Sequence, residues 1–153
     1  TLATHRTVGM GGAAQLAQEG MREEAVRLTA LRQRFWDSIV GLGDIRRNGH
    51  PDQRLPGALN ISVAFVEGEA LLMALKDLAI STGSACTSAS LEPSYVLKAI
   101  GLADALAHSS LRFSFGRFTT PEEVDTAAAQ LRHAVIKLRE SSPQWAAHSK
   151  GNA

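Results

Sequence analysis

The chain has 153 residues, of which 44% are hydrophobic, and its formal net charge is +1. This composition is typical of a globular domain and excludes a disordered tail. The small net charge gives no electrostatic case for a nucleic-acid partner or an anionic membrane, and no apolar run approaches the roughly 20 residues that cross a bilayer. The single cysteine, Cys86, excludes a disulfide framework and a cysteine-rich zinc site, and it indicates a reducing, cytoplasmic environment.

The first predicted element is one long helix over residues 8–42. Its apolar residues recur at helical spacing, whereas charged residues such as Arg32 occupy the other faces. The buried stripe is expected to contain Met21, Ala25, Leu28, Phe35 and Ile39. Gly41 and Gly43 predict the end of this helix.

Short helices and strands are expected to alternate along the rest of the chain. Residues 44–57 are polar and rich in glycine and proline, which predicts a surface connection. Strands are expected at 58–66, 79–81 and 110–116, and helices at 70–78, 93–100 and from Thr120-Pro121-Glu122-Glu123 onward, where a capping box is present. This order predicts an α/β sandwich with helices over one face of a small, mostly antiparallel or mixed sheet.

Residues 81–90 are ten small residues around Cys86, and none of them is large enough to build a core. A lone cysteine is more often a small buried hydrophobe than a nucleophile. Here the neighbours are polar and small, which reverses that preference. The segment therefore predicts a loop that carries a solvent-accessible, nucleophilic thiol.

The other candidate residues all have a structural interpretation. Arg112 has the pattern of a surface charge on the solvent face of a strand, and Lys76 that of a solvated helix residue. The five histidines are scattered, so they do not predict a metal cluster, and His108 is structural unless the fold brings it to Cys86. Residues 9–12 resemble a phosphate loop only weakly, because no strand precedes them.

Residues 82–94 (Thr-Gly-Ser-Ala-Cys-Thr-Ser-Ala-Ser-Leu-Glu-Pro-Ser) resemble the long-loop signature of the cysteine desulfurases, with Thr82 in the place of a serine. Four more segments match the same family, at residues 66–69, 73–79, 108–114 and 116–120. The chain is most similar to the housekeeping enzymes of iron–sulfur cluster assembly. The resemblance covers about residues 1–143, and the cysteine segment is its most specific motif.

This resemblance implies an α/β (α+β) fold, that of the C-terminal small domain of the fold-type I pyridoxal-phosphate-dependent transferases. A small sheet would be covered by helices and preceded by a long connecting helix. Residues 1–43 would form that helix and the end of the cofactor domain, and residues 44–153 the small domain with the cysteine loop. The implied activity is removal of sulfur from L-cysteine, which leaves L-alanine and a protein persulfide.

By the same resemblance, Cys86 matches the nucleophile that becomes the persulfide. Arg112 matches the arginine that binds the substrate carboxylate, and Thr1 matches a threonine that reaches the cofactor phosphate of the neighbouring subunit. The implied partners are an iron–sulfur scaffold protein and other sulfur acceptors, with the complete enzyme a homodimer. Cys86 is also expected to bridge a transient iron–sulfur cluster that the scaffold holds.

Two departures from the family pattern qualify these expectations. The family's cofactor lysine matches no position here and would lie upstream of Thr1, so the chain alone is expected neither to hold pyridoxal phosphate nor to turn over. The stretch after Pro143 is shorter than in the family, which puts scaffold docking in doubt. A non-catalytic sulfur-relay module and a selenocysteine or cysteine-sulfinate lyase remain as alternatives.

Overall fold

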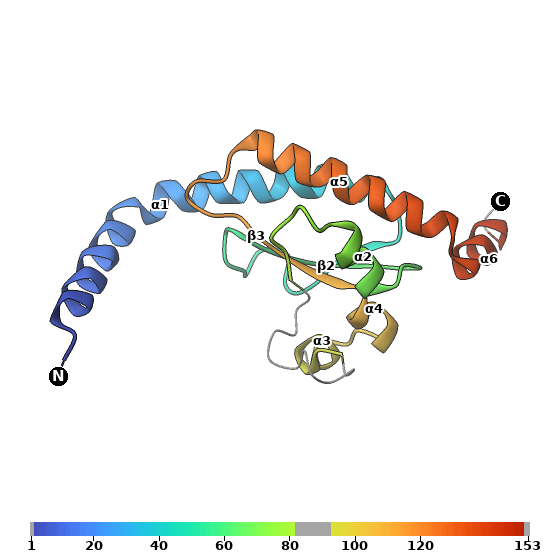
Figure 1. Ribbon diagram of the computed structural model, residues 1–153, viewed down its shortest axis with the longest axis horizontal. Coiled ribbons are helices and arrows are strands. Elements are labelled where there is room, and N and C mark those ends of the chain that lie inside the picture. The colour runs from blue at the N-terminus through green and yellow to red at the C-terminus, as the bar shows by residue number, and fades with distance from the viewer. Residues whose placement is uncertain (1, 82–92, 152–153) are drawn as a thin grey trace.

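A small antiparallel sheet with helices packed on it forms the body of the molecule (Figure 1). This computed structural model describes residues 2–81 and 93–151. The strands are β1 (Ile45–Arg47), β2 (Ala58–Val63) and β3 (Ser110–Ser114), in the order β1-β2-β3. The helices are α1 (Thr4–Val40), α2 (Gly68–Ala74), α3 (Tyr95–Ala99), α4 (Asp104–His108), α5 (Pro121–Glu140) and α6 (Pro143–Gly151). The predicted fold class is confirmed.

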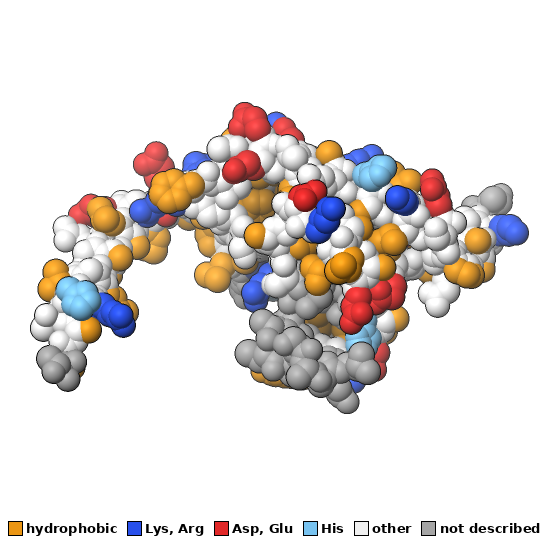
Figure 2. Space-filling view, viewed as in Figure 1, with side chains coloured by type: hydrophobic (Ala, Val, Ile, Leu, Met, Phe, Trp, Pro, Cys, Tyr) orange, Lys and Arg blue, Asp and Glu red, His pale blue; other side chains and the backbone are white. Residues whose placement is uncertain are grey.

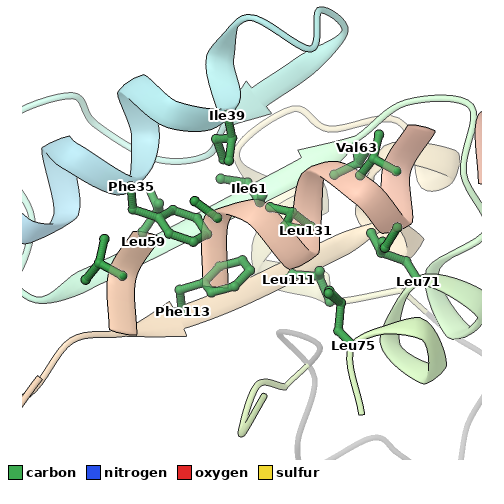
Figure 3. Packing of buried hydrophobic residues seen from close by; sticks show 14 of the residues in the cluster. Phe35, Ile39, Leu59, Ile61, Val63, Leu71, Leu75, Leu111, Phe113 and Leu131 are labelled. Carbon is green, nitrogen blue, oxygen red and sulfur yellow. The ribbon is translucent and has the colours of Figure 1, made fainter. Parts of the chain in front are cut away.

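The core lies between one face of the sheet and the two long helices, α1 and α5, which run side by side (Figures 1 and 3). Phe35 from α1 and Leu131 from α5 are completely buried against Ile61 of β2. The rings of Phe35 and Phe113 are 4.6 Å apart between centroids. Each such side chain contributes about 1.5–3 kcal/mol through burial, so this layer holds β3 firmly in place.

The front half of α1 extends away from the body, where no other described element covers it (Figure 1). Apolar side chains are therefore exposed along this arm, as Figure 2 shows, and they include Val8, Met10 and Leu16. The prediction that Met21 joins the buried stripe is wrong, because it is 61% exposed. Among the helices that the structure describes, none combines the length and the apolarity that a membrane span requires.

The end of α1 and the start of α5 follow the predicted signals. Gly41 caps α1, and Gly43 follows with a φ of 67°, a left-handed conformation that glycine adopts without strain. At α5, the Thr120 hydroxyl accepts a hydrogen bond from the backbone amide of Glu123, and the Glu123 carboxylate accepts one from the backbone amide of Thr120. This reciprocal capping box confirms the predicted helix start.

Several predicted elements differ from the structure. The segment expected to be only a connection contains β1, which pairs with β2 through Ile45↔Val63 and gives no alternation signal because it has three residues. The expected strand at 79–81 is a single bridge between Ser81 and Arg112. The helices α4 and α6 had no counterpart in the sequence analysis, and the helices predicted at 70–78 and 93–100 are shorter than expected, as α2 and α3.

Arg139, near the end of α5, holds two turns of the chain together. Its guanidinium donates to the carbonyl oxygens of Leu42, Gly43, Asp44 and Ala64, at 2.9–3.3 Å. Only 4% of Arg139 is exposed, and burial lowers its pKa. Because all its partners are neutral carbonyls, Arg139 stabilises the turns through hydrogen bonds and not through an ion pair.

The helix α6 packs over this arginine. The Trp145 ring centroid lies 4.4 Å from the Arg139 guanidinium carbon, a cation–π contact. Phe65, which has a φ of 65°, stacks on His148 at 4.5 Å, and the His148 Nε2 atom is 3.4 Å from the Asp44 carboxylate. These contacts fix the C-terminal helix against the turns that precede β1 and follow β2, which meet at one end of this antiparallel pair.

Candidate functional site

Arg112 stands on the face of the sheet that points away from α1 and α5. Its neighbours Leu111 and Phe113 are buried in the core, and the alternation of β3 leaves the Arg112 side chain exposed. No ion pair or side-chain hydrogen bond within residues 2–81 and 93–151 involves its guanidinium. A rigid strand therefore presents a planar cation whose donors are available to a ligand.

The backbone of Arg112 also anchors the start of the cysteine segment. Its amide nitrogen donates to the carbonyl oxygen of Ser81 at 2.9 Å, in the isolated bridge at the edge of β3. Ser81 is the last described residue before the stretch that contains Cys86. Two of the three predicted site residues, Thr1 and Cys86, lie outside the described residues, and so does the predicted exposure of the thiol.

Asn60 lies directly opposite Arg112 across the β2–β3 pair, on the same face of the sheet. Its Oδ1 atom accepts from the Nδ2 atom of Asn48 at 2.6 Å, and the same Nδ2 atom donates to the Ser62 hydroxyl at 2.9 Å. Asn48 is 5% exposed and Ser62 is fully buried. This polar network was missed in the sequence analysis, since its members become neighbours only through the strand register.

The turn between β3 and α5, residues 116–119, is held by α1. Arg27 donates to the carbonyl oxygens of Gly116, Arg117 and Thr119, at 3.1, 2.5 and 2.9 Å. Arg117 forms an ion pair with Glu24, and the hydrogen bond from Arg117 holds the pKa of the Glu24 carboxyl below its usual value. These contacts give the 116–120 motif a role in aligning β3 and α5 with α1.

The segment before β3 is positioned by a close backbone contact with Gly68. A Cβ atom at Gly68 would lie 2.1 Å from the carbonyl oxygen of His108, closer than any real contact. The His108 side chain is exposed. The structural interpretation of this side chain stays a prediction, because Cys86 lies outside the described residues, whereas the packing of the His108 backbone fixes where β3 and Arg112 begin.

A cavity of about 560 Å³ opens on the opposite, helix-covered side of β3. Its lining includes Phe35 and Phe113 and the carboxylates of Asp77, Glu122 and Glu123, with no cation among its residues. Such a lining repels a carboxylate ligand. The face that carries Arg112 is therefore the better candidate for binding an amino-acid substrate.

Within the parts of the chain that the structure describes, no three histidine, cysteine or acidic side chains converge to hold a metal ion. Cys86, the predicted ligand of a transient cluster, lies outside those parts.

A known protein family and several of its members are similar to this chain. The family model described as "Aminotransferase class-V" matches residues 1–127. The chain belongs to this family. Cysteine desulfurase IscS of Aeromonas hydrophila is 59% identical and that of Photobacterium profundum 60% identical, each over 151 residues. The match covers 99% of this chain but 37% of each relative, so the chain spans little more than a third of their length.

Two solved structures share the fold. The NifS-like protein from Rickettsia africae has a TM-score of 0.72 at 19% identity, over 82% of this chain and 33% of that one. A second NifS-like protein has a TM-score of 0.74 at 25% identity, over 86% of this chain and 33% of that one. The expected small sheet with its long preceding helix is thus a piece of a larger, known architecture.

Enzymes of this family use pyridoxal 5′-phosphate, which a lysine side chain holds through its aldehyde. The described residues do not fit this cofactor by themselves. All four lysines, Lys76, Lys98, Lys137 and Lys150, are exposed, and they are spread over separate helices and the turn after α2. None of them is enclosed in a site with groups that would bind the ring and the phosphate.

Proposed function

We propose that this chain is the C-terminal part of a cysteine desulfurase, an enzyme that moves sulfur from L-cysteine to a thiol of its own and leaves L-alanine. The observation that carries the proposal is the identity of 59–60% to cysteine desulfurases over 151 of the 153 residues. The exposed Arg112 beside the root of the cysteine segment supports it. The alternatives of a relay module and of a selenocysteine lyase have no comparable support.

Arg112 is proposed to bind the substrate carboxylate. A guanidinium presents two parallel N–H donors that match the two oxygens of a carboxylate. The exposed position of Arg112 leaves its donors accessible, and Asn60 on the opposite strand offers a polar neighbour and not a competing charge. The buried residues on either side of Arg112 keep its backbone fixed, so little order is lost when the ligand binds.

Cys86 is proposed to be the nucleophile. Its thiolate attacks the sulfur atom of the substrate and forms a new S–S bond, while the substrate C–S bond breaks. The electron pair of that bond stays on the substrate β-carbon, which takes up a proton and becomes the methyl group of alanine. The sulfur remains on the protein as a persulfide, and the bound cofactor supplies the electron withdrawal that the reaction needs.

The proposal extends to the organisation of the complete protein. Residues 1–43 form the connecting helix and the end of the cofactor domain, and residues 44–153 form the small domain with the cysteine loop. Thr1 contacts the cofactor phosphate of the partner subunit in a homodimer. Cys86 passes its sulfur to an iron–sulfur scaffold and other acceptors in the cytoplasm, and it transiently ligates the cluster that the scaffold carries.

The test uses the complete protein encoded by the reading frame that contains this chain. Cys86→Ser is expected to abolish the release of alanine and sulfide and to leave cofactor binding intact. After turnover by the unchanged protein, mass spectrometry should find about 32 Da added at Cys86, the mass of one sulfur atom. Normal desulfuration by Cys86→Ser would overturn the assignment of the nucleophile.

Arg112→Lys keeps the charge but removes the two-point contact with the carboxylate. Loss of a charged hydrogen bond of about 1.5–3 kcal/mol predicts that KM for L-cysteine rises by about 10- to 150-fold. Arg22→Lys, on the exposed surface of α1, is the matched control and should leave KM unchanged. A KM for Arg112→Lys equal to that of the control would return Arg112 to a surface role.

A further inference from the structure

Arg32 and Arg54 lie close together where the middle of α1 meets the loop between β1 and β2. The Arg32 Nη1 atom donates to the carbonyl oxygens of Leu55 and Pro56, at 3.2 and 3.0 Å. Arg54, which precedes these two residues, donates from Nη2 to the carbonyl oxygen of Asn48 at 3.2 Å. The loop thus places two guanidiniums next to each other.

Arg47, at the end of β1, is the third cation of this group. Its guanidinium carbon lies 5.2 Å from the ring centroid of Trp36, which is four residues after Arg32 on α1. Arg47 and Arg54 are half-buried, and Arg32 is 8% exposed. We call Arg32, Arg47 and Arg54 the arginine cluster.

No carboxylate among residues 2–81 and 93–151 forms an ion pair with the arginine cluster. The ion pairs formed within residues 2–81 and 93–151 use Arg34 and Arg117 but none of its three members. Burial lowers the pKa of Arg32 and of Arg54, and the charge of Arg47 lowers both further. The exposed Asp52 carboxylate opposes this effect only in part.

The cluster also has hydrogen-bond donors that the fold does not use. Each guanidinium carries five N–H groups, and those of Arg32 and Arg54 that are bonded go to neutral backbone carbonyls. The Arg32 Nε atom is buried without an acceptor. Three neighbouring cations with unused donors weaken the fold through repulsion and lost solvation, and an anion at this position would remove both costs.

We propose that the arginine cluster is a docking site for an acidic segment of a partner protein. A guanidinium binds a carboxylate through two hydrogen bonds, and the Trp36 ring behind Arg47 holds that guanidinium in place. Leu55 lies in the same loop and is 75% exposed, so the surface offers an apolar contact beside the cations. Glu and Asp residues interspersed with an apolar side chain match this arrangement.

A protein segment fits this surface better than a nucleic acid does. Nucleic-acid binding relies on many phosphate contacts spread along an extended basic surface. Here the net charge of the chain is only +1, and the cluster is a compact group of three cations and not an extended basic surface. A short acidic peptide needs no more than that.

The experiment measures binding of an acetylated peptide, Glu-Asp-Leu-Glu-Asp-Leu, to the 153-residue chain by calorimetry, and follows the Arg side-chain Nε–H and the Trp36 indole N–H resonances by NMR. Arg47→Gln and Arg54→Gln are each expected to weaken binding by about tenfold, the effect of one charged hydrogen bond. Arg46→Gln is the matched control. It removes the same charge from the exposed, opposite face of β1, and it should change the affinity by less than about twofold.

Shifts of the Trp36 indole and of the cluster's Nε–H resonances on peptide addition, with other arginines unchanged, would support the site. Three results would overturn it: no saturable binding of the peptide, an equal loss in Arg46→Gln and Arg47→Gln, or tighter binding of a single-stranded oligonucleotide than of the peptide. Thermal melts monitor folding of each variant.

Discussion

For the replacement of Gly68 by alanine, helix propensity and packing predict opposite changes in stability. Gly68 is the first residue of α2, where alanine has a helix propensity that is better by up to about 1 kcal/mol. The packing predicts the reverse. A Cβ atom would lie 2.1 Å from the His108 carbonyl oxygen, 3.0 Å from the His108 carbonyl carbon and 3.3 Å from the Ser109 Cα atom.

All three of these atoms belong to the backbone, so no side chain can turn aside to make room. The segment before β3 must shift, and overpacking of this kind costs about 1–3 kcal/mol. For a chain of this size, the loss corresponds to a fall in Tm of about 2–10 °C. We therefore expect Gly68→Ala to destabilise the chain in spite of its higher helix propensity.

Urea unfolding followed by circular dichroism measures this change. The matched control is Gly41→Ala. Gly41 is exposed at the end of α1 with a φ of −67°, and a Cβ atom there would meet nothing within 4 Å. The control is expected to leave the free energy of unfolding unchanged or to raise it by up to about 1 kcal/mol. If Gly68→Ala proved as stable as Gly41→Ala, the close contact between α2 and the start of β3 would be wrong.

Two further changes test other contacts. Arg139→Lys removes the planar guanidinium that donates to four carbonyl oxygens, so the free energy of unfolding should fall by about 2–4 kcal/mol. The exposed control Arg132→Lys should lower it by less than about 1 kcal/mol. Equal losses of both variants in urea unfolding would contradict the role of Arg139. A hydrogen bond from Arg34 at 2.6 Å lowers the pKa of Asp125. The stability from this pair is therefore present above the ordinary aspartate pKa of about 3.9 and is lost as the pH falls through the lower pKa of the folded state. In Asp125→Asn, the free energy of unfolding should depend less steeply on pH in this acidic range. An unchanged dependence on pH would refute the pairing.

The sequence predicted best those elements whose signals are local. The capping box at Thr120 and the alternation that buries Leu111 and Phe113 while exposing Arg112 each depend on residues a few positions apart. The sequence could not show how much of the length of α1 is packed against the sheet and α5. Met21 has the spacing of a core residue, yet it is 61% exposed, because the buried residues of α1 begin only at Leu31.

Contacts between distant segments escaped the sequence for the same reason. Arg139 has the pattern of a surface residue near a helix end, but its partners lie between Leu42 and Ala64, far back in the chain. Asn60 and Asn48 show their relation only after β1 and β2 are paired in register. For the candidate site, the exposure of Arg112 is confirmed, whereas its role and those of Cys86 and Thr1 stay predictions.

The hydrogen bond between Arg112 and Ser81 limits how far the proposed nucleophile can lie from the proposed substrate-binding residue. It fixes the root of the cysteine segment to the strand that presents the proposed substrate-binding cation. Cys86 is the fifth residue after Ser81, and an extended chain advances at most about 3.3–3.6 Å per residue. The length of this stretch therefore allows at most about 18 Å between the Cα atoms of Ser81 and Cys86. In the proposed reaction, an acceptor therefore has to bring its thiol or cluster to within about this distance of Ser81.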